Sequence, residues 1–335
     1  MEKAACSNMP ISMKHLYVIP LVLALCGILR ADESNFDTAP DASWTIFDPL
    51  SNFGPVQKGD IDYSANTCRM TCDRYSLAEL QQLVADYGEG IIPAVAPRIF
   101  LFAPTSFADT CVSVDLIDWT PTTNRSADGQ YHVLFTRIQP AIGSGTVSGY
   151  GMAMIDRGDG NAELEIDIIF NEALFEVAIM SFPYNQETTY RLLFSSRGNV
   201  HTARVFDLNT PASPVAELQY TDPDDNFPTG RTGFGVLTDR YTDPVYYAPP
   251  DATFDNFLTW DAKPCPVLIE PGVAPGTFVI VSDLYRSMGT DLETATDPAA
   301  AWQPATPVSS EVAGGQLRLV FNVDQPSRFF RRKNL

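Results

Sequence analysis

The chain has 335 residues, of which 22 are basic and 41 acidic, and its formal net charge is −19. Such an acidic surface repels nucleic acid and anionic lipid, which argues against both as partners. It is compatible with neutral sugars and with bound calcium, and it keeps an exported protein soluble. The length predicts one large domain or two smaller ones.

The N-terminus has the pattern of a cleaved export signal. Lys14 precedes an apolar run over residues 16–29, which is shorter than the roughly 20 residues that span a bilayer. Ala31 is the expected last residue of the signal, and Met13 is an alternative start. No later segment is long and apolar enough to cross a membrane. We expect residues 1–31 to be removed and the mature chain to be secreted, periplasmic or held at the cell surface by non-covalent contacts.

Four cysteines remain in the mature chain, namely Cys68, Cys72, Cys111 and Cys265. Export permits disulfides, and four cysteines allow three pairings. We favour a local bridge between Cys68 and Cys72, or a bridge from one of these two to Cys111. Zinc is the weaker alternative for Cys68 and Cys72, because no histidine lies near them in the sequence.

One segment, residues 76–88, carries apolar side chains at helical spacing. Ser76 can cap its start, Glu79 stands three residues later as in a capping box, and Gly88 can end it. We expect one short helix, which would cover an open sheet edge or an end of the core.

From residue 98 onward, apolar and polar side chains alternate in many short segments separated by turn residues. Alternation with a period of two predicts strands that bury one face. Many short strands at regular spacing predict a sandwich or a barrel. The expected strands include residues 98–102, 112–117, 132–136, 164–168, 175–179, 190–194, 203–206, 232–236 and 253–260.

A domain boundary is expected where two prolines and Cys265 follow the last of these strands. Residues 32–42 are predicted to be a polar linker and residues 43–261 a β-sandwich. Residues 265–335 are predicted to form a small β-module, with strands at 277–281 and 317–321.

Four stretches of the sandwich region carry a family resemblance. They are residues 149–154, residues 189–194 with a turn at Gly198, residues 228–236 and residues 252–257. Through them the region resembles the concanavalin A-like, or laminin-G-like, jelly-roll sandwiches of secreted bacterial proteins. This resemblance implies an all-β jelly roll with one short inserted helix.

The tail of the chain carries a second resemblance. Residues 302–304 and 326–331 look like parts of small C-terminal modules in exported planctomycete and verrucomicrobial proteins. This resemblance implies an accessory role for the tail and a bacterial origin.

Glu165 and Asp167 are the sharpest catalytic candidates, because alternation puts them on one face of a strand. Family 16 glycoside hydrolases share the implied fold and use a Glu-Ile-Asp motif followed by a second glutamate. Apolar residues occupy the matching positions 169–170, and Glu172 lies at an odd step from Asp167. Glu163 is the other partner on the same face. The alternative, which we favour, is a solvated acidic face of an antiparallel strand.

Two further features suggest binding sites. The resemblance implies that calcium could be held by Asp255 on the closing strand, whereas the acidic loops 156–161 and 222–226 are explained by turn chemistry. Tyr241, Tyr246 and Tyr247 lie in a proline-rich loop, where they would stack on sugar rings or pack on the sheet rim.

The first functional hypothesis is an exported, non-catalytic protein that binds a glycan or another cell-surface polymer. A glycoside hydrolase on the same fold and a structural envelope component are the alternatives, because one sandwich hosts many functions. No Gly-x-Ser-x-Gly elbow, phosphate loop or dinucleotide fingerprint is present in the sequence.

Overall fold

A computed structural model describes most of the chain after residue 30. The described ranges are 31–49, 58–73, 75–90, 96–120, 129–157, 160–211, 213–238, 249–261, 268–271, 277–283, 292–295, 303–305, 307–313, 316–322 and 329–332. Residues 1–30 of the expected export signal lie outside them, whereas Ala31, its expected last residue, is the first residue of a strand. Within these ranges we find no helix with the length and apolar character needed to cross a membrane.

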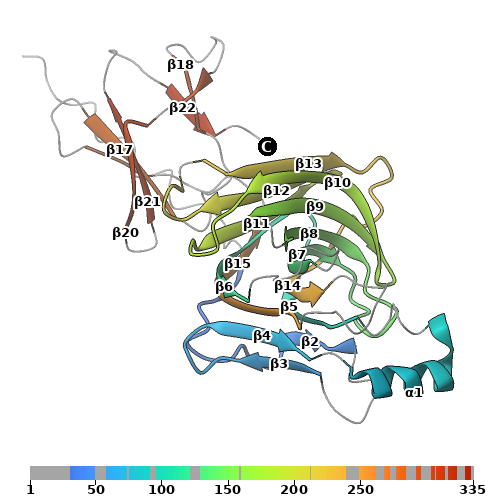
Figure 1. Cartoon of the computed structure of the whole chain (residues 1–335). Coiled ribbons are helices and arrows are strands. Elements are labelled where there is room, and N and C mark those ends of the chain that lie inside the picture. Colours follow the sequence, from blue (N-terminus) through green and yellow to red (C-terminus); the bar gives the residue numbers. More distant parts are fainter. Residues whose placement is uncertain are drawn as a thin grey trace, which may run out of the picture. The chain divides into compact units, whose positions relative to one another are not determined.

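Two antiparallel sheets face each other (Figure 1). The eight-stranded sheet contains β13 (Ala216–Thr221), β12 (Val200–Asp207), β11 (Tyr190–Arg197), β6 (Thr110–Trp119), β15 (Asp251–Asp261), β4 (Cys68–Cys72) and β3 (Gly59–Asp62) in this order, with β1 (Ala31–Ser34) also paired to β15. The seven-stranded sheet contains β10 (Ala173–Pro183), β9 (Asn161–Phe170), β8 (Gly149–Asp156), β7 (Gln130–Ile138), β14 (Gly230–Thr238), β5 (Arg98–Phe107) and β2 (Thr45–Phe47). The predicted all-β jelly-roll sandwich is confirmed.

Two smaller antiparallel sheets lie in the C-terminal part of the chain. One contains β16 (Leu268–Pro271), β17 (Thr277–Asp283), β21 (Gln316–Asn322) and β20 (Ser309–Ala313). The other contains β19 (Gln303–Pro304), β18 (Leu292–Ala295) and β22 (Phe329–Arg332). The predicted β-rich segment after the sandwich is confirmed.

The core lies between the two large sheets and is built from one alternating set of side chains on each strand. On β9 this set is Ala162, Leu164, Ile166 and Ile168, which all belong to the main buried cluster. The simple alternation fails on the central strands, because β7 and β8 are buried at every position. Their second face must therefore also be covered, which the expectation of one buried face did not include.

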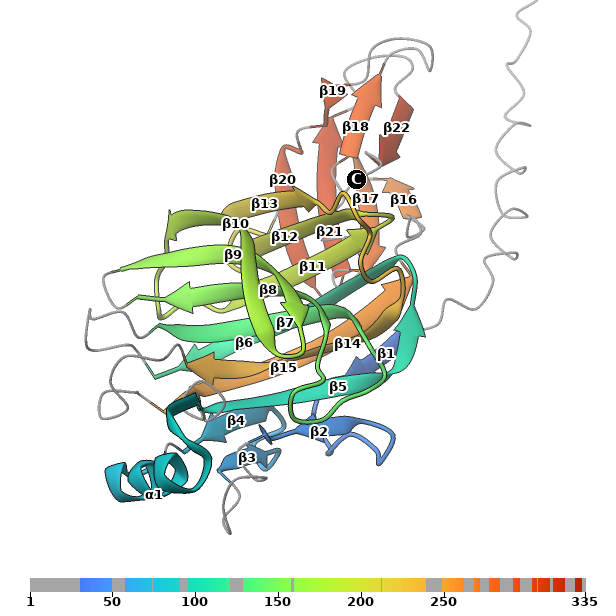
Figure 2. The ribbon, with the colours of Figure 1, turned by 90° about the vertical axis from the view of Figure 1, so that its right-hand side faces the viewer.

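The single helix, α1 (Leu77–Tyr87), forms as predicted. The Ser76 side chain accepts a hydrogen bond from the Glu79 amide, and the Glu79 carboxylate accepts one from the Ser76 amide, which completes the capping box. Gly88 ends the helix with φ 85°. Leu80 and Leu83 join the main buried cluster, so the helix covers one end of the core. Both views place α1 beside β3 and β4 (Figures 1 and 2).

Residues 32–42, which we expected to be a polar linker, begin inside the sandwich. Residues 31–34 form β1 and pair with β15, so that Ala31 lies opposite Trp260. The Asp32 carboxylate accepts hydrogen bonds from the amide and the hydroxyl of Thr105. Phe36 is fully buried in the main cluster and has φ 54°. The polar composition of residues 31–34 did not indicate a strand, although Asp32 bonds to Thr105 of β5.

The local disulfide that we favoured between Cys68 and Cys72 does not form. The two residues stand at opposite ends of β4, and four steps along a strand separate their Cα atoms by about 13 Å. A disulfide needs Cα atoms within about 7 Å. Both thiols are unbridged and buried. Cys111 is buried on β6, and Cys265 lies outside the described residues.

Candidate functional site

The outer face of the seven-stranded sheet, which points away from the core, is lined with aromatic and aliphatic side chains. Phe100 and Phe102 of β5 lie there with Tyr131, Val133 and Phe135 of β7. The Phe100 and Phe135 rings meet edge to face at 4.8 Å between centroids. This second apolar cluster explains why the central strands are buried on both sides.

Two glycines of β14 make room for these rings. A Cβ atom at Gly235 would stand 2.7 Å from Cδ1 of Phe100 and 2.2 Å from the Ile99 carbonyl oxygen. A Cβ atom at Gly233 would stand 2.4 Å from Cδ1 of Phe102. The two glycines therefore let aromatic rings from β5 lie directly on the backbone of the neighbouring strand.

A cavity of about 360 Å³ is present on this outer face. Phe100, Tyr131 and Phe135 line it, together with the carboxylate-bearing residues Asp167 and Glu172. The connection between β7 and β8, residues 139–148, covers part of the face. Its Val147 is buried and its Ile142 packs against the apolar cluster, so the cavity has a wall as well as a floor.

A tight hairpin turn between β9 and β10 fixes that connection in place. Asn171 and Glu172 both have positive φ, 50° and 69°, as the two-residue turns of type I′ require. The Glu172 amide donates to the Val147 carbonyl at 2.8 Å, and the Asn171 amide donates to Ser148 Oγ at 2.9 Å. The Glu172 carboxylate also accepts a hydrogen bond from the Gly145 amide and forms an ion pair with Arg98.

Glu172 therefore lies where strand parity did not put it. Its odd distance from Asp167 suggested the opposite face, but the residue is part of a turn and parity no longer applies. Glu172 and Asp167 both line the cavity. Their roles differ, since Glu172 is ion-paired with Arg98, whereas Asp167 has no ion-pair partner in the described part of the chain.

Glu163, Glu165 and Asp167 share the outer face of β9, as alternation predicted. They are not the solvated row that we favoured, because Glu165 and Asp167 are each only 5% exposed. Arg157 binds the end of the row at 2.7 Å from Glu163 and 3.7 Å from Glu165. Beside Asp167 and Glu165, the facing residues on β8 are Gly151 and Ala153, whose small size leaves the carboxyl groups without a polar neighbour there.

Burial raises the pKa of both inner carboxyls. For Glu165, removal from water is the main cause, the charges of Asp167 and Glu176 add to it, and Arg157 opposes it; the pKa rises to about 8. For Asp167, burial and the Glu176 carboxylate on the adjacent strand β10 raise the pKa to about 7. Perturbed carboxyls beside a cavity are typical of functional sites.

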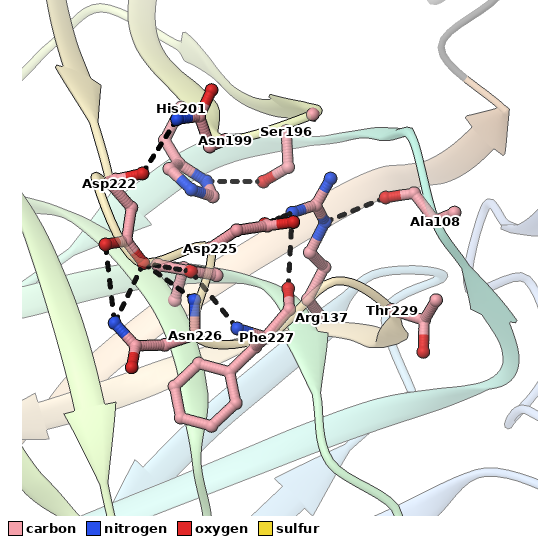
Figure 3. Close-up of polar contacts among 12 residues, drawn as sticks. Ala108, Arg137, Ser196, Asn199, His201, Asp222, Asp225, Asn226, Phe227 and Thr229 are labelled. Carbon is pink, nitrogen blue, oxygen red and sulfur yellow. Dashed lines mark hydrogen bonds and ion pairs between the residues drawn. The ribbon is translucent and has the colours of Figure 1, made fainter.

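A separate cluster of polar side chains, around Asp222 and His201, is held by hydrogen bonds (Figure 3). The Asp222 carboxylate accepts hydrogen bonds from the Tyr150 hydroxyl at 2.6 Å and from the Asn226 amide at 3.0 Å. Loop 222–226 is therefore a turn, as expected. His201 lies 2.9 Å from Ser196 Oγ, but it is fully buried and its Nε2 has no hydrogen-bond partner among the described residues. The pair does not complete a hydrolytic triad.

Asp255, the calcium candidate, lies in an irregular part of β15 next to Asn256, which has φ 52°. Its oxygens accept hydrogen bonds from the Asn256 amide and side chain. The described ranges contain no group of three or more His, Cys, Asp or Glu residues that could hold a metal. Calcium at Asp255 stays a prediction.

The other predicted sites have different outcomes. Tyr241, Tyr246 and Tyr247 lie outside the described residues. In the acidic loop 156–161, the Asp156 side chain is buried and accepts hydrogen bonds from Trp119 and Tyr184. It supports the core and is not a surface ligand.

Sequence reasoning missed the aromatic lining of the cavity. The signal was present, because Phe100 and Phe102 alternate on β5 and Tyr131, Val133 and Phe135 alternate on β7. These residues share a face with Arg98, which is polar, and the runs were read as strands with one apolar face. Apolar residues on both faces of adjacent strands predict a second covered surface.

Comparisons with known proteins give structural likeness only. No protein-family model and no curated protein matches the sequence. Among solved structures, a CBM2 module of the evolved Dit of Lactobacillus casei BL23 phage J-1 matches with a TM-score of 0.44 and 12% identity, covering 69% of this chain and 96% of that one. The carbohydrate-binding module CBM66 from Bacillus subtilis has a TM-score of 0.40 and 14% identity, with coverages of 65% and 95%. The winged bean acidic lectin, complexed with methyl-α-D-galactose, has a TM-score of 0.43 and 8% identity, with coverages of 69% and 99%.

Proposed function

We propose that this chain is an exported, non-catalytic carbohydrate-binding protein, and that its ligand enters the cavity on the outer face of the seven-stranded sheet. One observation carries the proposal: aromatic residues line the same cavity as a buried carboxyl that no described residue pairs with. Aromatic faces stack on the C–H faces of sugar rings. The Asp167 carboxyl and the Asn171 side chain, which also lines the cavity, supply groups for hydroxyls.

The size of the cavity fits a short piece of ligand. At about 360 Å³ it lies near the lower end of the usual range for small-molecule sites, about 300–1,000 Å³. The wall formed by residues 139–148 limits the space along the sheet. We therefore expect the end of a saccharide chain or a single branch, held at a cell surface or in an extracellular polymer, with calcium at Asp255 as an additional part of the proposal.

Binding to oligosaccharides tests this function directly. The full chain is applied to a glycan array and to affinity gels with immobilised polysaccharides. We expect retention that weakens at least tenfold in Phe100→Ala, because the stacking surface is lost, while Asp60→Asn on β3 keeps it. Retention on no glycan, or equal retention of Phe100→Ala, would contradict the proposal.

A second candidate, a glycoside hydrolase, is favoured by one observation. Glu165 and Asp167 share a face and have raised pKa values, about 8 and about 7, as a general acid requires. Incubation with soluble polysaccharides would then release reducing ends, and Glu165→Gln would abolish the release. Turnover in wild type that Glu165→Gln removes would replace the binding proposal by the enzymatic one.

A further inference from the structure

The cavity contains an acidic group that has no counter-charge among the described residues. Asp167 is 5% exposed and lines the cavity. It has no hydrogen-bond or ion-pair partner among the residues that the structure describes. A buried carboxylate is strongly unfavourable unless a cation or several donors compensate it. Because the described residues supply neither, a ligand in the cavity can provide the compensation.

The charged neighbours increase this need. Glu163 and Glu165 precede Asp167 on the same face of β9. Glu176 of the adjacent strand β10 lies directly opposite Asp167. β8 contributes Gly151, which has no charge. Of these neighbours, the Glu176 carboxylate repels a negative charge at Asp167 and so raises the pKa of Asp167.

The two arginines near the face already have partners. Arg157 is bound to Glu163 and Glu165 and lies over the Tyr131 ring at 5.7 Å. Arg98 forms an ion pair with Glu172 at the turn. Neither has a hydrogen bond or ion pair to Asp167, so neither offsets the negative charge that Asp167 carries when it is ionised.

The aromatic lining suits a cation as well. Phe100, Tyr131 and Phe135 line the same cavity as Asp167. The face of an aromatic ring attracts an organic cation within about 6 Å, and more strongly where water is excluded. An ammonium group here would meet a carboxylate and aromatic rings together.

We propose that the cavity recognises an organic ammonium group and, in an inference that rests on the proposed function, that its ligand is a sugar with a free amino group. The amine takes the place of the missing partner of Asp167, and the ring of the sugar lies on the aromatic side chains. A neutral sugar of the same shape leaves the carboxyl group uncompensated.

Ion pairing in the cavity predicts proton release on binding. The pKa of Asp167 is raised to about 7 and that of Glu165 to about 8, so both are mainly protonated at pH 6. A bound ammonium favours the ionised carboxylate and lowers these pKa values. Affinity for an amine should therefore rise with pH between about 5 and 7, by up to about tenfold per unit for each proton released.

Three oligosaccharides of equal length with the same β-1,4 linkage measure the contribution of the amine to affinity. Chitosan, chitin and cellulose oligomers carry an amine, an acetamide and a hydroxyl at the same carbon. Calorimetry with the full chain at pH 6 should give at least about tenfold tighter binding of the chitosan oligomer. Only this oligomer should show an enthalpy that depends on the ionisation enthalpy of the buffer, which reports proton release.

Two matched variants locate the effect. Asp167→Asn should weaken chitosan binding about 10- to 100-fold, change cellulose binding by less than about threefold, and remove the buffer dependence. Asp60→Asn removes the same charge from an exposed site on β3 and should change none of these values by more than about twofold. Circular dichroism confirms that both variants are folded.

The outcomes separate this inference from the proposed function. Equal affinity for all three oligomers, unaffected by Asp167→Asn, overturns the inference and leaves carbohydrate binding intact. If no oligomer binds, butylammonium is titrated as a probe without a sugar. Asp167-dependent binding of butylammonium then supports the ammonium site while the carbohydrate proposal fails, and no binding of any probe overturns both.

Discussion

The two large sheets both bury charged side chains on their outer faces, but they do so in different ways. On the eight-stranded sheet, Arg191 is fully buried and binds both oxygens of Asp115, at 2.6 and 2.5 Å. Asn256 donates a further hydrogen bond to Asp115 at 2.9 Å. On the seven-stranded sheet, Asp167 is just as buried and has no such partner among the described residues.

The two sheets therefore differ in how a buried carboxylate is compensated: Asp115 is paired within the protein, whereas Asp167 is paired with no described residue. A buried pair that is fully hydrogen-bonded contributes to a unique packing of the sheet, although it is not by itself a strong source of stability. An unpaired buried carboxyl contributes nothing to the fold and is retained at a cost. Such groups cluster at sites that bind or react. Four experiments test whether the contrast holds, from the largest expected effect to the smallest.

Breaking the satisfied pair should have the largest effect. Arg191→Met leaves Asp115 buried without its bidentate partner, and we expect a loss of about 3–5 kcal/mol in the free energy of unfolding. Denaturation with urea measures it. The exposed bidentate pair of Arg69 and Asp251 is the control, because Arg69→Met should cost less than about 1 kcal/mol. Equal losses of unfolding free energy in the two variants would show that burial does not change how much an ion pair contributes to stability.

Removing the carboxyl group of Asp167 should, in contrast, increase the free energy of unfolding. The pKa of Asp167 is raised on folding, so ionisation destabilises the fold as the pH rises from about 4, the value in the unfolded chain, to about 7. Below about pH 4 the group is protonated in both states and this cost is absent. Asp167→Asn should therefore stabilise the protein by about 2–4 kcal/mol at pH 8 and by little at pH 4.

The measurement is the unfolding free energy of wild type and variant from pH 4 to pH 8. Asp60→Asn, exposed on β3, should show no such pH-dependent gain. A variant that is less stable than wild type at pH 8 would mean that Asp167 is paired in the folded protein. The comparison of the two sheets would then fail.

The aromatic lining gives the third prediction. Gly235→Ala places a methyl group against the Ile99 carbonyl and the Phe100 ring, and overpacking of this kind costs about 1–3 kcal/mol. It should also displace Phe100 and weaken ligand binding. Gly90→Ala, where a Cβ atom meets nothing within 4 Å, should change neither stability nor binding measurably. Unchanged ligand binding in Gly235→Ala would show that the Phe100 ring does not contact the ligand.

The smallest effect is expected from a substitution at the start of helix α1, which does not line the cavity. Ser76→Ala removes the acceptor for the Glu79 amide and should destabilise the protein by about 1 kcal/mol, with no change in ligand affinity. Thermal unfolding and calorimetry measure the two quantities. A parallel loss of affinity would indicate that stability alone explains the effects of the other variants.

Local patterns predicted the elements better than they predicted the site. The capping box of α1 and the strands with alternating side chains need only neighbours in sequence, and both are confirmed. The placement of Glu172 depends on a two-residue turn whose residues, Asn and Glu, carry no glycine signal. The burial of Asp167 depends on β8, β10 and residues 139–148 together, which no local pattern encodes.

The pairing of β1 with β15 has a consequence for the order of events in folding. β1 begins at Ala31, and its partner β15 is the last strand of the sandwich along the chain. The eight-stranded sheet therefore closes through a contact of very long sequence separation, which makes folding slow. Until Trp260 has been synthesised, Ala31 has no partner residue, so the pairing of β1 can form only after the last strand of the sandwich has been made.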